Sequence, residues 1–258
     1  MKRITAFIYG TASYLVFFVS LLYLFGFLTS VGVPKAINDG TATPFLLAFV
    51  INTGLILLFG LQHSVMARPA FKRWWTRMVP KSVERSTYVL LSSGIFFLLF
   101  WQWRPMPGVI WQFESFAALT TAWALFGAGI AILFASTFVI NHFDLFGLRQ
   151  VWLNLTNKPY TYLKFKVTWF YKFVRHPLYV GWFLIFWATP LMTLGHLLLA
   201  MGMGAYMLIA IRYEERDLET FHGEAYREYK RKVPMLIPRP GKVHATVKPA
   251  KEAPLAGA

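Results

Sequence analysis

The chain has 258 residues, of which 57% are hydrophobic and only 14% are charged, and its mean hydropathy is +0.48. Water-soluble domains are about 45–50% apolar and about 25% charged, so this composition excludes a water-soluble fold and indicates an integral membrane protein. The net charge of +15 is interpreted here as a sign of orientation and of contact with anionic lipid, so we expect the lipid bilayer, and no nucleic acid, as a partner. The chain has no cysteine, which excludes disulfides, thiolate metal sites and cysteine nucleophiles.

Apolar stretches of the length needed to cross a bilayer, about 20 residues, follow one another along the chain. Five stand out, at 6–31, 44–66, 87–103, 116–141 and 178–211. The last is too long for one crossing and is interrupted by Pro190 and Gly195, so we interpret it as two short helices, 178–191 and 194–212, in a tight hairpin. The sequence therefore predicts an all-α, polytopic transmembrane helix bundle with five to six spans, the last two forming a helical hairpin.

Basic residues are distributed unevenly between the predicted loops. With six spans, 24 of the 26 Lys and Arg fall on the side of the two termini, and only Lys35 and Arg104 fall on the other side. Because Lys and Arg concentrate in cytoplasmic loops, both termini are predicted to be cytoplasmic, and any elaborate site is expected on that face. Residues 1–238 are predicted to form the membrane domain, and the Pro-, Ala- and Lys-rich segment 239–258 a disordered tail.

The first polar cluster, Gln62-His63-Ser64, lies at the inner end of the second predicted span. Asn52 falls on the same helical face, because eleven residues make about three turns. Polar side chains within a membrane helix face the bundle or a water-filled cavity and are candidates for function. The alternative is that His63 only contributes to helix packing at the interface.

The second polar cluster, Asn141-His142-Phe143-Asp144, ends the fourth predicted span. It combines hydrogen-bond donors and acceptors with an imidazole that titrates near neutral pH. The alternative is an ordinary solvated helix end. Two polar clusters at the same depth, however, favour a shared site.

The third motif, YKFVRHPLYVG at 171–181, opens the fifth predicted span. Pro177 suits the first turn of a helix, where its missing N–H is no loss, and Gly181 allows a helix or a ligand to approach closely. Beyond the hairpin, six of the eleven acidic residues fall between 214 and 228. These charges could form ordinary pairs along a solvated helix, but the hairpin returns them to Arg175 and His176, where a carboxylate, an imidazole and two tyrosines can meet.

Two of these motifs together resemble the C-terminal half of the isoprenylcysteine carboxyl methyltransferase superfamily. They are RHPLYVG at 175–181 and, after the hairpin, Glu214-Glu215 with Gly223, Tyr226, Tyr229 and Val233-Pro234. The N-terminal half, with QHSVMARPAFKRWW, ERSTYV and WQWRP, is similar to the NnrU-like branch of that superfamily. With NHFDLFGLRQ added, the chain to about residue 238 resembles the bacterial methanethiol S-methyltransferases, which make dimethyl sulfide.

The resemblance implies an enzyme of the bacterial inner membrane that transfers a methyl group from S-adenosyl-L-methionine to a small thiol, most simply methanethiol. The donor would bind at the cytoplasmic face. The cofactor-binding residues that the resemblance implies are Arg175, His176, Tyr179, Gly181, Glu214, Glu215, Tyr226 and Tyr229. The Gly-x-Gly-x-x-Gly pattern of soluble nucleotide-binding folds is absent from the sequence, and the resemblance implies that membrane helices hold the donor.

Direct methyl transfer requires the acceptor sulfur, the methyl carbon and the leaving sulfur to lie in line, and the thiolate is the nucleophile. His63 and His142 are the predicted bases, since an imidazole titrates in the useful range. Gln62 and Asn141 are predicted to orient them. Neither a metal nor a covalent intermediate is needed for this chemistry, and we expect neither.

Two other classes of protein remain open from the sequence. A carboxyl or phospholipid methyltransferase of the same superfamily would share the donor site and differ in the acceptor tunnel. A small-molecule transporter or a haem-binding membrane protein could place His63 and His142 face to face across the bundle. Against transport, the polar groups gather at one end of the spans rather than along a pore.

Overall fold

The computed structural model describes residues 2–161, 163 and 167–239, so the predicted tail lies, apart from its first residue, outside the described residues. The described chain is mostly helical and has only two short strands, which confirms the expected fold class. Its elements are α1 (Arg3–Thr29), α2 (Phe45–Ala67), α3 (Pro69–Trp75), α4 (Lys81–Gln102), β1 (Val109–Gln112), α5 (Phe116–Ile140), α6 (His142–Leu145), α7 (Leu148–Leu155), the 3-10 helix η1 (Trp169–Lys172), α8 (Pro177–Trp187), β2 (Leu191–Thr193), α9 (Leu194–His222) and α10 (Glu224–Lys232).

Five helices, α1, α2, α4, α5 and α9, are long and apolar enough to cross a bilayer. The sixth predicted passage is different, because α8 has 11 residues. That length gives about 16 Å of helix, against a hydrocarbon core of about 30 Å. The helix predicted at 178–191 is shorter in the structure. It ends at Trp187, and the chain then forms strand β2.

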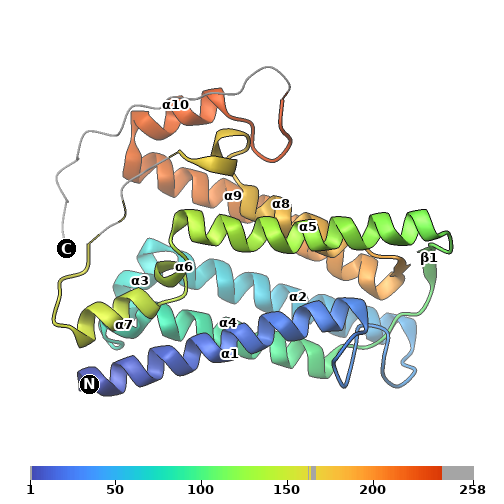
Figure 1. Ribbon diagram of the computed structural model, residues 1–258. Helices are drawn as coiled ribbons and strands as arrows, with labels where there is room; N and C mark the ends of the chain where they lie inside the picture. Colours follow the sequence, from blue (N-terminus) through green and yellow to red (C-terminus); the bar gives the residue numbers. More distant parts are fainter. Residues whose placement is uncertain (1, 162, 164–166, 240–258) are drawn as a thin grey trace.

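The long helices run side by side in a bundle (Figure 1). α1 packs against α4, α2 packs against α4 and α9, and α5 packs against α8. One end of the bundle carries the start of α1 together with the short helices α3, α6 and α7. We call this the basic end, because the long basic loops of the sequence lie there. The strands lie at the opposite end, which we call the strand end.

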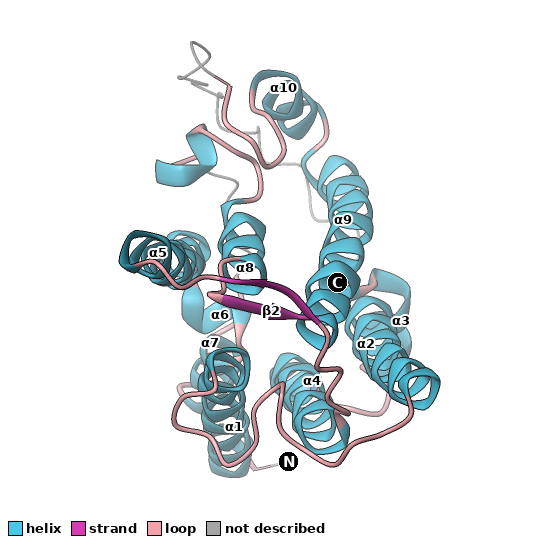
Figure 2. Cartoon of the chain, turned by 90° about the vertical axis from the view of Figure 1, so that its right-hand side faces the viewer, coloured by secondary structure: helices cyan, strands magenta, loops and turns pink. Residues whose placement is uncertain are grey.

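An antiparallel strand pair that the sequence analysis does not predict closes the strand end. β1 lies between α4 and α5, β2 lies between α8 and α9, and Val109 pairs with Thr193. Figure 2 looks onto this end and shows the two strands crossing in front of the helices. The N–H of Leu194 also donates to the carbonyl of Gly108 at 2.7 Å. The pair therefore ties the loop after α4 to the hairpin between α8 and α9.

Asn52 belongs to this closure and not to the polar cluster at the other end of α2. Its amide nitrogen donates to the carbonyl of Arg104 at 2.7 Å, and its amide oxygen accepts from the N–H of Arg104 at 2.9 Å. The ammonium of Lys35 donates to the carbonyls of Trp101, at 2.6 Å, and Trp103, at 2.9 Å. Asn52 and Lys35 thus hold the same loop in place. This structural role explains the polar side chain of Asn52 within a span, and no bound ligand is needed to explain it.

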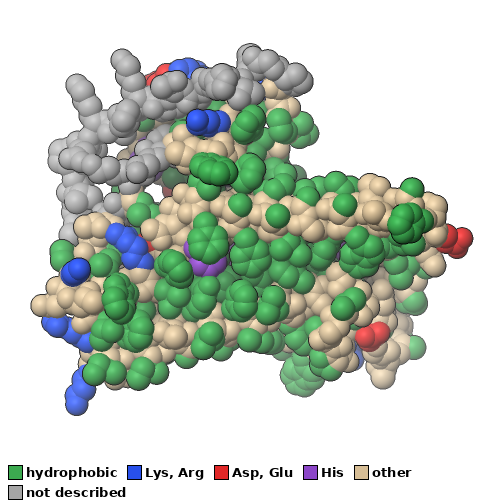
Figure 3. Space-filling view, in the orientation of Figure 1, with side chains coloured by type: hydrophobic (Ala, Val, Ile, Leu, Met, Phe, Trp, Pro, Cys, Tyr) green, Lys and Arg blue, Asp and Glu red, His purple; other side chains and the backbone are tan. Residues whose placement is uncertain are grey.

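Hydrophobic side chains cover the outside of the bundle as well as its interior. Figure 3 shows them spread over the middle of one face, with Lys and Arg gathered at the basic end. Leu46 is 72% exposed and Phe116 is 84% exposed, whereas Trp103 and Phe27 are fully buried. A belt of exposed apolar side chains around a packed core is the surface that lipid acyl chains solvate.

α5 and α8 approach each other at a contact between two glycines. A Cβ atom on Gly181 would lie 2.8 Å from the carbonyl oxygen of Gly129 and 2.9 Å from the nitrogen of Leu133. A Cβ atom on Gly129 would lie 2.9 Å from the carbonyl oxygen of Gly181. Neither distance leaves room for a side chain. The two helices therefore pack backbone to backbone, and the contact holds α8 against the middle of α5.

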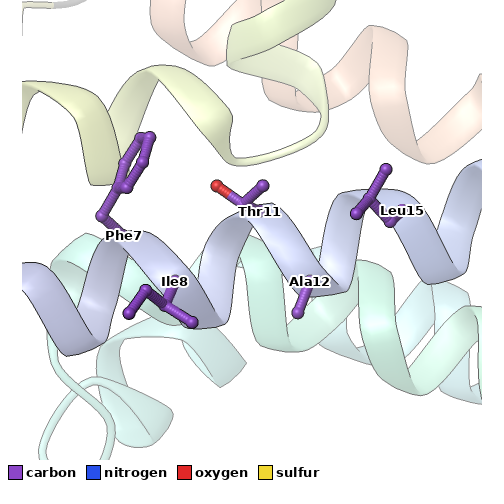
Figure 4. Close-up of a pocket in the computed structure, with 5 residues that line it drawn as sticks. All are labelled: Phe7, Ile8, Thr11, Ala12 and Leu15. Carbon is purple, nitrogen blue, oxygen red and sulfur yellow. The ribbon is translucent and has the colours of Figure 1, made fainter.

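Two shallow hollows lie on the apolar surface. One, of about 270 Å³, is formed by α1 alone, with Phe7, Thr11 and Leu15 on one side of the helix and Ile8 and Ala12 on the other (Figure 4). The second, of about 330 Å³, is lined by apolar side chains of α5, α8 and the segment before α8. Neither hollow is lined by a residue of the predicted site.

Candidate functional site

An ion-pair network around Glu215 joins three segments that are far apart in the sequence. Nε of Arg175 lies 2.7 Å and Nε2 of His176 lies 3.1 Å from Oε1 of Glu215. Nζ of Lys230 lies 2.9 Å from Oε2. The Arg175 side chain also donates to the carbonyls of Lys230, at 3.1 Å, and Val233. Because the Glu215 side chain is only 7% exposed, these partners offset the large cost of burying a carboxylate.

The residues before α8 are extended and pair with the segment after α10. A residue that precedes proline is disfavoured in the helical region, and His176, before Pro177, has φ −127° and ψ 62°. The N–H of Arg175 donates to the carbonyl of Pro234 at 2.9 Å, and the N–H of His176 donates to that of Met235 at 3.2 Å. The Arg-His-Pro and Val-Pro motifs therefore lie side by side.

Two buried tyrosines anchor α10 beside this network. Tyr226, Tyr229 and Val233 are each at most 2% exposed and pack together. The hydroxyl of Tyr229 donates to the carbonyl of Tyr171 at 2.7 Å. Burial raises the pKa of Tyr226 and Tyr229 well above the ordinary value, so both hydroxyls are neutral. Hydrogen bonds to carboxylates of α9 raise the pKa of Lys230, which stays charged.

Glu214 lies next to Glu215 in α9 but faces a different group of side chains. Its Oε2 accepts a hydrogen bond from the hydroxyl of Tyr179 at 3.1 Å. Within residues 2–161, 163 and 167–239, no Lys, Arg or His forms an ion pair with Glu214.

His63 is held by hydroxyl groups of α4. Its Nε2 lies 2.6 Å from the hydroxyl of Tyr88, and its Nδ1 lies 3.2 Å from Oγ of Ser92. Oγ of Ser92 has two acceptors for its single proton, the side-chain oxygen of Gln62 at 3.2 Å and the carbonyl of Tyr88 at 2.9 Å. We therefore assign the imidazole proton to Nδ1, with Tyr88 donating to Nε2. Gln62 reaches His63 through Ser92, and its orienting role stays a prediction.

The imidazole of His142 has the same kinds of partner. Its Nε2 lies 2.8 Å from the hydroxyl of Tyr14, and its Nδ1 lies 2.9 Å from Oγ1 of Thr137. Thr137 donates its own proton to the carbonyl of Phe134 at 2.7 Å, so the imidazole proton is again on Nδ1. The ring of Phe138 stacks on His142 at 4.4 Å, and the residue is 4% exposed.

Asn141 has a local structural role in this second cluster. Its side-chain oxygen accepts from the N–H of Asp144 at 3.0 Å and caps α6. Asp144 in turn forms an ion pair with Arg149 at 2.9 Å. No hydrogen bond joins the side chain of Asn141 to His142 within the described chain.

The structure brings the first and third clusters together. The ring of Tyr206 lies 6.1 Å from the ring of His63. The helix that carries His63, α2, packs against α9, which carries Glu214.

A layer of aromatic rings separates the second cluster from the first. Phe17 and Phe146, stacked at 4.1 Å, pack against the group that includes Tyr88 on one side, and Phe146 contacts His142 at 4.9 Å on the other. No hydrogen bond or ring contact between His63 and His142 occurs in the described part of the chain. The two imidazoles are therefore not arranged face to face as shared ligands of one group.

Three residues of this arrangement are not among the predicted site residues: Tyr88, Tyr206 and Lys230. Tyr206 precedes Glu214 by eight residues, a spacing of about two helical turns that places both on one face of α9. That spacing could have indicated Tyr206 from the sequence. Lys230 lies in a run of basic residues that gives no sign of which one turns inward.

Gly181 has a packing role in the structure, since its contact with α5 is backbone to backbone. The described residues contain no group of three or more His, Asp or Glu side chains placed to hold a metal ion.

Comparisons with known proteins were made for the whole sequence. The chain is 53% identical over 240 residues to the methanethiol S-methyltransferase of Mycobacterium tuberculosis. The alignment covers 93% of this chain and 98% of that protein. It is 50% identical over 242 residues to the methanethiol S-methyltransferase of Crocosphaera subtropica, covering 94% of this chain and 95% of that one. Nurim of Bos taurus is 27% identical over 232 residues, covering 85% of this chain and 88% of nurim.

No family model and no solved structure matches the chain. The curated relatives nevertheless align with nearly its full length, at identities far above the level at which a family relationship is in doubt. The resemblance stated from the motifs is thereby confirmed. The chain belongs to the methanethiol S-methyltransferase family, and it is a membrane methyltransferase.

Proposed function

We propose that the protein transfers a methyl group from S-adenosyl-L-methionine to methanethiol, giving dimethyl sulfide. The names of the relatives support the reaction. The observation that carries the proposal is the convergence of the Arg175–Glu215 network, the Glu214 carboxylate and the His63 cluster at the basic end of the bundle.

The residues around Glu214 and Glu215 have the chemistry that the donor needs. When bound, S-adenosyl-L-methionine supplies a methyl group on a positively charged sulfur, together with an amino acid and a nucleoside. Glu214 and the tyrosine hydroxyls offer acceptors and donors at an apolar boundary. The predicted residues of this region, proposed to hold the donor, are Arg175, His176, Tyr179, Gly181, Glu214, Glu215, Tyr226 and Tyr229.

We place the general base at His63. The hydroxyl of Tyr88 donates to Nε2 of His63, so it can accept the thiol proton while it passes its own to the imidazole. The acceptor sulfur then bonds to the methyl carbon as the bond from that carbon to the donor sulfur breaks. His142 remains the second candidate for the base; its nitrogens are engaged like those of His63, but its side chain is more deeply buried.

We also propose that the basic end faces the cytoplasm, in the inner membrane of a bacterium. The uneven distribution of Lys and Arg supports this orientation. It places the donor site on the side where the donor is made.

The test is turnover by the purified full-length protein in detergent with S-adenosyl-L-methionine and methanethiol, with dimethyl sulfide detected by gas chromatography. Vesicles of bacterial phospholipid and a prenylcysteine serve as alternative acceptors with radiolabelled donor. Dimethyl sulfide formation that depends on the donor is the expected result. Label that enters lipid or the prenylcysteine, with no volatile sulfide, would contradict the proposed acceptor.

A further inference from the structure

An ion pair that the proposed function does not use joins the helix of the proposed base to the helix of the donor carboxylates. Nη1 of Arg68, the residue that follows α2, lies 2.9 Å from Oδ2 of Asp217 in α9. Nε of Arg68 also donates to the carbonyl of Ser64 at 3.2 Å, and its guanidinium lies 5.4 Å from the centre of the Tyr213 ring. Arg68 is therefore held by its own helix and by two side chains of α9.

Close contacts deeper in the bundle set the register between α2 and α9. A Cβ atom on Gly202 would lie 2.9 Å from Cγ2 of Ile56, and a Cβ atom on Gly60 would lie 3.1 Å from Cδ2 of Tyr206. Four residues along α2 thus correspond to four residues along α9. The two helices therefore run in the same direction with a constant register.

Continued to the end of α2, this register brings Arg68 level with Glu214. His63 lies five residues before Arg68, which is about 7.5 Å along the helix axis at a rise of about 1.5 Å per residue. Asp217 follows Glu214 by three residues, about one helical turn. The ion pair therefore ties α2 to α9 at the height of Glu214 and close to His63.

The exposure of the ion pair makes it better suited to hold the helices in position than to stabilise the fold. The side chains of Arg68 and Asp217 are 30% and 44% exposed, and ion pairs that water reaches contribute little to the free energy of unfolding. The rate of a reaction is far more sensitive to position, since a displacement of about 1 Å can lower it about 100-fold. A contact that adds little stability can therefore control turnover.

We propose that Arg68 and Asp217 are positioning residues, whose ion pair sets the height of His63 on α2 relative to Glu214 on α9. This assignment rests on the proposed function. The proposed donor site is built from the segment that opens α8, from α9 and from α10, so it does not need the pair. Loss of the pair therefore slows methyl transfer and leaves donor affinity unchanged.

The first test measures kcat and donor affinity for Arg68→Gln, Asp217→Asn and the double variant, with the full-length protein in detergent. Each single change is expected to lower kcat about tenfold, while the Kd for S-adenosylmethionine, from calorimetry, changes by less than about twofold. The double variant should be no slower than either single variant, because both changes remove the same contact. Losses that multiply in the double variant, or a Kd that rises as kcat falls, would overturn the assignment.

Glu228→Gln is the matched control. It breaks an ion pair with Lys232 inside α10, and the side chains of that pair are 39% and 47% exposed, close to the values for Arg68 and Asp217. It should change neither kcat nor donor affinity. An equal fall in kcat would mean that loss of any exposed ion pair slows the enzyme, which would overturn the positioning role.

A second test measures the position of the two helices and needs no activity. Because the chain has no cysteine, spin labels can be attached through Val50→Cys on α2 and Ile209→Cys on α9, both at exposed positions. The distance between the labels, from pulsed electron paramagnetic resonance, is expected to shift or broaden with Asp217→Asn and to stay the same with Glu228→Gln. An unchanged distance with Asp217→Asn would overturn the inference. If the labels respond but the wild type forms no dimethyl sulfide, the proposed function is wrong instead.

Discussion

His63 and His142 are held by the same set of hydrogen-bonding groups but lie in different surroundings. In each case a tyrosine hydroxyl contacts Nε2 and a serine or threonine hydroxyl contacts Nδ1. His142 is buried against Phe138, whereas His63 is partly exposed and lies beside Tyr206. The hydrogen bonds fix both rings in one tautomer. The proposed base, His63, thus differs from His142 in lying beside Tyr206 of α9, the helix that carries Glu214.

The sharpest way to break this comparison is to remove each imidazole in turn. His63→Ala is expected to lower kcat roughly 100-fold or more, the usual range for loss of a general base. His142→Ala should retain kcat within about threefold in the fraction that folds. Initial rates of dimethyl sulfide formation, normalised to the amount of folded protein, measure both. Comparable losses in the two variants would mean that the buried ring takes part in the chemistry.

Stability should show the reverse order. His142→Ala leaves the hydroxyls of Tyr14 and Thr137 without their partner in a buried site, and we expect the free energy of unfolding to fall by about 2 kcal/mol. His63→Ala should have the smaller effect, because the side chain of His63 is less buried than that of His142. Thermal unfolding midpoints in one detergent provide the comparison. A larger drop for His63→Ala would refute the structural assignment of His142.

The two tyrosines that contact Nε2 offer a subtler comparison. Tyr88→Phe removes the hydroxyl of the proposed relay and keeps the ring, so kcat is expected to fall roughly tenfold with little change in donor affinity. Tyr14→Phe, the matched change at His142, should leave kcat unchanged. The separate measurement of kcat and of donor binding distinguishes a relay from a contact with the donor. If both variants turn over alike, the relay through Tyr88 is wrong.

The smallest expected effect is a dependence of stability on pH. Burial lowers the pKa of His142 below its ordinary value, so the folded protein holds this ring neutral. Its contribution to stability is therefore complete above the unfolded pKa of about 6.5 and is lost as the pH falls from there through the folded pKa. Between pH ~7.5 and pH ~5.5 the unfolding midpoint of the wild type should drop more than that of His142→Gln. Parallel drops would show that other groups carry the pH dependence.

Much of the fold could be predicted because the bilayer alone determines the length of the apolar stretches and the side on which Lys and Arg gather. The long helices follow from these patterns. The short α8 and the strand pair do not, because they depend on contacts between segments that are distant in the sequence, such as Val109 with Thr193. Asn52 shows the same limit. Helical periodicity predicts which face of α2 carries Asn52, but it does not predict that Asn52 lies level with Arg104 in the bundle.

Residues of the candidate site that belong to short motifs could be predicted from the sequence, whereas residues that join the site through contacts between helices could not. Arg175 and His176 were indicated by the proline that follows them, and Glu214 and Glu215 by the hairpin that returns them. The difference between the two carboxylates could not be predicted, because it depends on which face of α9 meets α8 and α10. Tyr88 became part of the site only through its contact with His63, across two helices.

The contact between Gly129 and Gly181 has a mechanical consequence. Because α5 and α8 touch along their backbones, with no side chain to reorient between them, a tilt of one helix must carry the other with it. His176 at the start of α8 and Asn141 at the end of α5 are thus two fixed anchors of the stretch of chain between them. The two helices therefore behave as one rigid body, and the start of α8 keeps its position against α5.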